Sequence, residues 1–129
     1  MGSLELVKLP ALMERNTGKP EVSIGLIDGP VATQHPDLTS EYLREISGKN
    51  GATCTQANRI ACLHGTFVAR ILFAKRNSLA PAICPNCTLL ARPIFTEATS
   101  GREQIPSATP KNLQRRRSND RMHATPQPD

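Results

Sequence analysis

An aspartate and a histidine, 36 positions apart, are the side chains of this chain best placed for acid–base chemistry. Asp28 follows the largely apolar run 22–27, and His64 heads the apolar segment 64–74. A carboxylate that accepts a hydrogen bond from one imidazole nitrogen fixes the tautomer of the ring, and the other nitrogen is then free to take a proton from a hydroxyl. The pair therefore predicts two of the three members of a Ser-His-Asp hydrolase site.

The run 21–28 predicts the strand that carries the aspartate. Its β-branched and aliphatic residues are typical of a strand buried on both faces of a parallel sheet, and we expect it to be a central strand. An aspartate at the carboxyl end of such a strand lies where open α/β sheets form their ligand crevice. Gly29 then allows the backbone to turn away from the strand.

The segment 64–74 predicts the helix that carries the histidine, with His64 at its first residue. Lys75 and Arg76 follow, and cations favour the negative end of a helix. We expect one face of this helix to pack through Phe67, Val68, Ile71 and Leu72.

Three weaker patterns complete the predicted elements. Residues 4–15 predict a short helix begun or broken at Pro10, residues 41–46 a helical turn, and the apolar run 88–91 a second strand. A strand, a helix and a further strand give the βαβ order of an α/β fold with a parallel sheet.

Composition excludes several function classes. Lys and Arg outnumber Asp and Glu by 16 to 11, but no basic cluster with interleaved aromatics appears, so we expect no nucleic-acid partner. No apolar run has the ~18 residues that a membrane span requires, and the N-terminus lacks signal-peptide character. We expect a cytoplasmic chain with no membrane partner.

Four cysteines leave several alternatives open. Reduced thiols are the default in the cytoplasm. Cys84 and Cys87 form a C-x-x-C pair that would complete a four-thiolate zinc site with Cys54 and Cys62, but seven residues separate the latter two. Bridges from Cys54 to Cys62 or from Cys84 to Cys87 are the alternatives in an oxidising compartment. We expect no metal and no cofactor.

Two motifs carry a family resemblance. Residues Ile24–Val31, followed by His35–Leu38, resemble the aspartate motif of the subtilisin-like serine proteases, and His64–Ala69 resembles their histidine motif. The run Leu79–Phe95 is similar to the strand that follows the histidine helix in this family. The resemblance covers about residues 4–114 and is strongest to the branch linked to maturation of cyanobactin and bacteriocin peptides.

The resemblance implies the N-terminal portion of a subtilisin-like α/β domain. It implies that Asp28 orients and His64 acts as the general base of a serine endopeptidase, whose intact relatives cleave peptide precursors. His35 is expected to belong to a turn rather than to the chemistry. Arg70 stands where the family has glycine, and Leu63 where a small residue is common, so the packing around His64 is expected to differ.

The third member of the site has no match. The family's nucleophile lies in a downstream Gly-Thr-Ser motif, and Ser100, only 36 residues after His64, lies in a polar context unlike it. The oxyanion-hole asparagine has no counterpart either. We therefore expect the chain to be inactive alone, and the alternative is a non-catalytic interaction partner complemented by a chain that bears the serine.

Two regions are predicted. Residues 1–95 form a partial subtilisin-like peptidase domain, and residues 96–129 a polar, proline-containing tail that we expect to be disordered. The resemblance stops after about Gln114. The hypothesis for residues 115–129 is an out-of-frame sequence, and a natural short form that pairs with a serine-bearing chain is the competing one.

Overall fold

A computed structural model describes residues 3–38, 40–46 and 54–95 of the 129. The predicted tail at 96–129 and Ser100 lie outside the described residues. The described chain runs in the order α1, α2, β1, β2, α3, β3.

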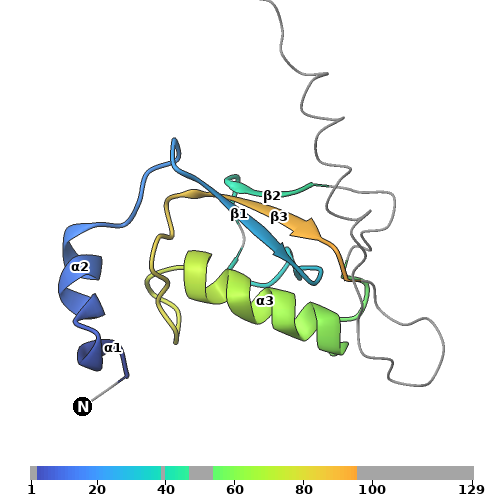
Figure 1. Ribbon diagram of the computed structural model, residues 1–129, viewed down its shortest axis with the longest axis horizontal. Coiled ribbons are helices and arrows are strands. Elements are labelled where there is room, and N and C mark those ends of the chain that lie inside the picture. The colour runs from blue at the N-terminus through green and yellow to red at the C-terminus, as the bar shows by residue number, and fades with distance from the viewer. Residues whose placement is uncertain (1–2, 39, 47–53, 96–129) are drawn as a thin grey trace, which may run out of the picture.

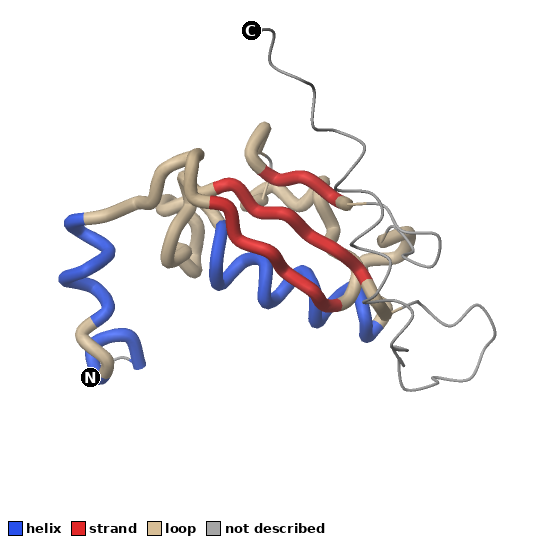
Figure 2. The backbone as a smooth tube through the Cα atoms, turned by 45° about the horizontal axis from the view of Figure 1, so that its top comes forward, coloured by secondary structure: helices blue, strands red, loops and turns tan. Residues whose placement is uncertain are grey.

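A parallel sheet forms the centre of the fold. Its strands β1 (Ser23–Asp28), β2 (Leu43–Glu45) and β3 (Thr88–Pro93) lie in the order β1-β3-β2, and both pairings are parallel. Figure 2 shows the three strands, in red, side by side. The predicted α/β class with a parallel sheet is confirmed. In the described sheet β3 is the middle strand and β1 lies at an edge, so the expected central position of β1 is not observed.

The short strand β2 replaces a predicted helical turn. The local sequence of residues 41–46 favours that turn, and the prediction is wrong because Leu43 pairs with Leu89 of β3. Pairing with a buried neighbour outweighs the weak preference of a six-residue segment.

Helix α3 (Ile60–Phe73) packs on one face of the sheet and contacts β1 and β3 (Figure 1). It begins four residues before the predicted start, so His64 lies in the second turn rather than at the first residue. Its buried residues are mostly small: Ala61, Cys62, Gly65, Ala69 and Phe73.

The face predicted to pack is therefore only partly correct. Val68 and Leu72 pack against the core, but the side chains of Phe67 and Ile71 are exposed, and Phe67 is 62% exposed. Small residues on the inner face bring the helix close to the backbone of the neighbouring segment, whereas Phe67 and Ile71 remain on the outer side. The core itself is almost wholly aliphatic, built on Leu26, Val31, Leu38, Ala69, Phe73, Leu89 and Ala91.

Two short helices precede the sheet. Helix α1 (Ser3–Leu6) and helix α2 (Leu9–Arg15) are separated by Val7 and Lys8. Lys8 has a positive φ of 56°, and Pro10 lies in the first turn of α2. The predicted break near this proline is confirmed. No helix in the described ranges is both long and apolar enough to cross a membrane.

Arg76 fixes the end of α2 to the loop that follows α3. Its guanidinium donates to the carbonyl oxygens of Met13 (2.7 Å), Asn16 (2.8 Å) and Ile83 (3.1 Å). The first two bonds join the end of α2 to this loop, and Figure 1 shows α2 on the side of the molecule away from the arrowhead of β1.

Candidate active site

Asp28 and His64 meet at the carboxyl end of β1. The Nδ1 atom of His64 lies 2.8 Å from Oδ1 of Asp28, and the same carboxylate oxygen accepts a 2.6 Å hydrogen bond from the amide of Gly29. The carboxylate side chain is 17% exposed and the imidazole 64% exposed. The structure therefore brings together the two side chains that the sequence singles out.

The contact determines which nitrogen of the neutral ring is available. An ionised carboxylate only accepts hydrogen bonds, so Nδ1 must donate, and the neutral ring then carries its lone pair on Nε2. Among the described residues, no group bonds to Nε2 of His64. An exposed imidazole held in this tautomer is able to remove a proton from a hydroxyl placed at Nε2.

The approach of β1 to α3 depends on glycines. A β-carbon on Gly29 would collide with the backbone of Ala61, and one on Gly65 would collide with the carbonyl groups of Gly29 and Pro30. The first residues after β1 therefore lie directly against the first turns of α3. This close approach sets the separation between Asp28 and the helix that carries His64.

Thr66 adds a directed bond to the same contact. Its Oγ1 accepts a 2.9 Å hydrogen bond from the amide of Ala32. Gly65 and Thr66 belong to the histidine motif His64–Ala69, but the sequence predicts no specific contact for either residue. Their position within the histidine motif was the available signal for a positioning role.

A disulfide joins Cys54 to Cys62 in the first turn of α3. The default expectation of four reduced thiols is therefore wrong for these two residues, and a bridge between them was one of the alternatives left open. Two of the four sulfurs that a zinc site needs are consumed by the bridge. The four-thiolate zinc site is therefore not formed.

Cys84 and Cys87 are free thiols beside an apolar pocket of about 350 Å³. Burial, followed by the neighbouring Cys87, raises the pKa of Cys84 to about 11. The pair occupies a turn before β3. In the described part of the chain, no three or more His, Cys, Asp or Glu side chains gather in a way that could hold a metal ion.

Leu63 and Arg70, which depart from the family pattern, do not disturb the contact between Asp28 and His64. Leu63 is exposed, so its size meets no neighbour in the core. Arg70 points its guanidinium to Asp37 rather than crowding the sheet, with a 2.9 Å bond between Nη2 and Oδ2. His35 lies in the turn that contains Asp37, as expected, and its backbone amide donates to the carbonyl of Ala32.

An apolar stripe runs along the outer side of α3 beside His64. Its members follow helical spacing and are all exposed: Ile60, Leu63, Phe67 and Ile71. The opposite side of the same helix packs on the sheet. A helix that is apolar on two sides is typical of one buried in a larger assembly.

No family model and no curated protein matches this chain, but solved structures do. The protease domain of PatA superposes with a TM-score of 0.67 at 26% identity, over 94% of this chain and 38% of the PatA chain. The prenylagaramide maturation protease PagA gives a TM-score of 0.64 at 24% identity, over 92% of this chain and 36% of that chain.

A third match concerns the fold alone. The macrocyclase domain of PatG has a TM-score of 0.57 at 15% identity, over 72% of this chain and 44% of that chain. The chain thus spans less than half the length of each of these solved structures. Each of the three matches nevertheless covers most of the residues of this chain.

Proposed function

The chain has the fold of the N-terminal part of the subtilisin-like proteases of cyanobactin maturation, and from this premise we propose that it supplies the aspartate–histidine half of a serine endopeptidase site. In this proposal Asp28 orients the ring and His64 is the general base. The observation that carries it is the 2.8 Å contact between the two side chains at an otherwise exposed imidazole. The substrates are peptide precursors, because PatA and PagA are maturation proteases.

The chemistry assigns one step to each residue. Nε2 of His64 removes the proton from a serine hydroxyl while the serine oxygen attacks the peptide carbonyl, and the imidazolium then gives that proton to the leaving amine. Water later releases the acyl group through the same base and acid steps at His64. The Asp28 carboxylate stabilises the imidazolium, and the Gly29 amide holds the carboxylate in place.

The serine comes from outside the described residues. We propose that the chain is inactive alone and becomes active when a serine-bearing segment packs against α3. Loss of the nucleophile from a subtilisin-type site costs about 10⁶ in turnover, so the pair alone leaves almost no activity. The exposed stripe beside His64 supports this, because a covering segment would bury it and bring a hydroxyl near Nε2.

The second candidate is a non-catalytic interaction partner. The same stripe favours it, because an exposed apolar face binds another chain whether or not chemistry follows. In that case Asp28 and His64 would have no catalytic role in this chain. The two candidates differ in whether the assembled complex contains an activated serine.

A fluorophosphonate probe decides between them, since it labels only an activated serine. The chain is assayed alone and fused by a flexible linker to the part of the PatA protease domain that it does not match. Catalysis predicts labelling of the fusion, none of the chain alone, and loss of labelling in His64→Ala and Asp28→Asn fusions. A folded fusion that stays unlabelled contradicts the catalytic proposal and favours the interaction partner.

The cytoplasmic location also remains a prediction. Disulfides are rare in reducing compartments, and the Cys54–Cys62 bridge makes the location testable. Cells are quenched with a thiol-blocking reagent and the chain is analysed by mass spectrometry. A chain with four blocked thiols supports a reducing compartment, and one with two supports an oxidising one.

A further inference from the structure

The segment that leaves β1 lies along α3 and is held by it at successive turns. Gly29 packs on Ala61, and the amide of Ala32 donates to Thr66. The furthest of these contacts is made by the Arg70 side chain. This last contact lies outside the site described above and is absent from the family pattern, in which a glycine stands at this position.

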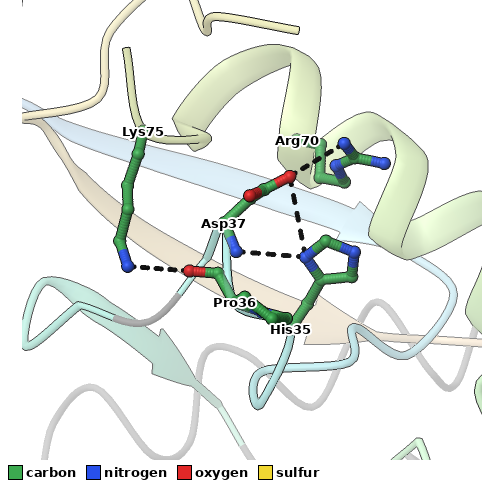
Figure 3. A network of polar contacts seen from close by, with 5 residues as sticks. All are labelled: His35, Pro36, Asp37, Arg70 and Lys75. Carbon is green, nitrogen blue, oxygen red and sulfur yellow. Dashed lines mark hydrogen bonds and ion pairs between the residues drawn. The ribbon is translucent and has the colours of Figure 1, made fainter. Parts of the chain in front are cut away.

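Figure 3 shows the polar contacts at this far end. Nη2 of Arg70 donates to Oδ2 of Asp37 at 2.9 Å, and the amide of Asp37 donates to Nδ1 of His35 at 3.2 Å. Nζ of Lys75 donates to the carbonyl of Pro36 at 2.7 Å, and the amide of Lys75 donates to the carbonyl of Asp37 at 3.0 Å. The turn at 35–37 is therefore bound to α3 by the side chain of Arg70, and to the residue two positions after the helix, Lys75, by side-chain and backbone bonds.

The Arg70–Asp37 pair closes a ring of contacts that includes the candidate site. From Asp28 the chain runs to Asp37, across the ion pair to Arg70, back along α3 to His64, and across the 2.8 Å contact to Asp28. Arg70 lies six residues after His64, about 9 Å along a rigid helix. The Arg70–Asp37 contact thus fixes one end of the chain segment whose other end carries Asp28.

We propose that Arg70 and Asp37 are positioning residues for the Asp28–His64 pair. Both side chains are partly buried, at 31% and 26% exposed, so solvent screens their attraction less than at an open surface. They touch neither reacting atom and act by fixing the turn against the helix. The catalytic use of Asp28 and His64 rests on the proposed function, but the positioning of these two side chains by Arg70 and Asp37 does not.

The test measures the hydrogen bond rather than proteolysis. A hydrogen bond to Asp28 slows the exchange of the His64 Nδ1 proton with water relative to a free imidazole, and this exchange rate is measured by NMR on the full chain. Arg70→Met keeps the bulk of the side chain and removes the charge, and Asp37→Asn removes the partner charge. We expect about tenfold faster exchange in each, the effect of losing roughly one charged hydrogen bond.

Two further variants separate positioning from general stability. Arg76→Met removes an arginine that clamps α2 at a distance from the site, so it should lower thermal stability without changing the exchange rate. The double variant Arg70→Asp with Asp37→Arg restores an ion pair and should recover most of the slow exchange. If Arg70→Met does not fold, Asp37→Asn and the double variant decide the question.

Unchanged exchange in Arg70→Met and Asp37→Asn would overturn the proposal. An equal acceleration in Arg76→Met would overturn it as well, because the effect would then be one of stability. The exchange result is independent of fluorophosphonate labelling. An unlabelled fusion with slow Nδ1 exchange refutes the proposed function alone, and a labelled fusion with unaffected exchange in the variants refutes the positioning role alone.

Discussion

Gly65 of helix α3 packs directly on the carbonyl group of Gly29, the first residue after β1. The two glycines let the backbones of strand end and helix approach more closely than any side chain would allow. Asp28 and His64 are the chain neighbours of these glycines. The close contact between the glycines therefore sets the distance over which the carboxylate and the imidazole meet.

Replacing Gly65 with alanine tests this contact. Alanine normally stabilises a helix interior by up to about 1 kcal/mol relative to glycine. Here the added β-carbon meets the carbonyl groups of Gly29 and Pro30, so we expect a net loss of about 1–3 kcal/mol in the free energy of unfolding, typical of overpacking. Chemical denaturation measures the loss. A gain in stability would contradict the prediction, because it would show that α3 can move away from Gly29 and Pro30 without loss of stability.

The Cys54–Cys62 bridge gives a second prediction. It links positions eight residues apart, for which the chain-entropy relation gives about 2.5 kcal/mol. The double variant Cys54→Ser, Cys62→Ser should lose about this amount of stability relative to the oxidised chain. Reductant should destabilise the original chain and leave the double variant unchanged. A reductant effect of equal size on both would assign the loss to something other than this bridge.

Cys84 should react slowly with alkylating reagents. Its pKa is raised to about 11, mainly by burial, and only the thiolate attacks. At pH 8 the thiolate fraction is then about 0.1%, against about 10% for a cysteine with an ordinary pKa of 9.0, so the rate should be about a hundredfold lower. Because the pKa is raised, the rate should still be increasing above pH 10.

Peptide mapping by mass spectrometry follows this reaction residue by residue. The chain unfolded in denaturant provides the control, since the same cysteine is then solvated. Equal alkylation rates of Cys84 in the folded and the unfolded chain at pH 8 would contradict the raised pKa.

The sequence was sufficient to find the pair and the two elements that carry it. Asp28 follows a β-branched run and His64 lies within an apolar helical segment, and both patterns reflect local preferences that the tertiary fold keeps. The βαβ order followed from the same patterns. The strand β3 was also recognisable, because its burial makes the run 88–91 largely apolar.

Features that depend on neighbours distant in sequence could not be predicted. Residues 43–45 became a strand only because β3 offers them a partner. The inner face of α3 was misjudged because its small residues pack against the backbone that follows β1, and hydrophobic periodicity favours the larger side chains of the outer face. The ion pair between Arg70 and Asp37 spans 33 residues, and no local pattern signals such a contact.

The most direct test of the account is the tautomer of His64. A long-range ¹H–¹⁵N NMR spectrum, which reports which ring nitrogen carries the proton, is recorded for the chain and for Asp28→Asn. We expect a proton on Nδ1 and a free Nε2 in the original chain, and loss of this preference in Asp28→Asn, because an amide no longer selects the donor nitrogen. A proton on Nε2 in the original chain, or the same tautomer in both proteins, would contradict this expectation.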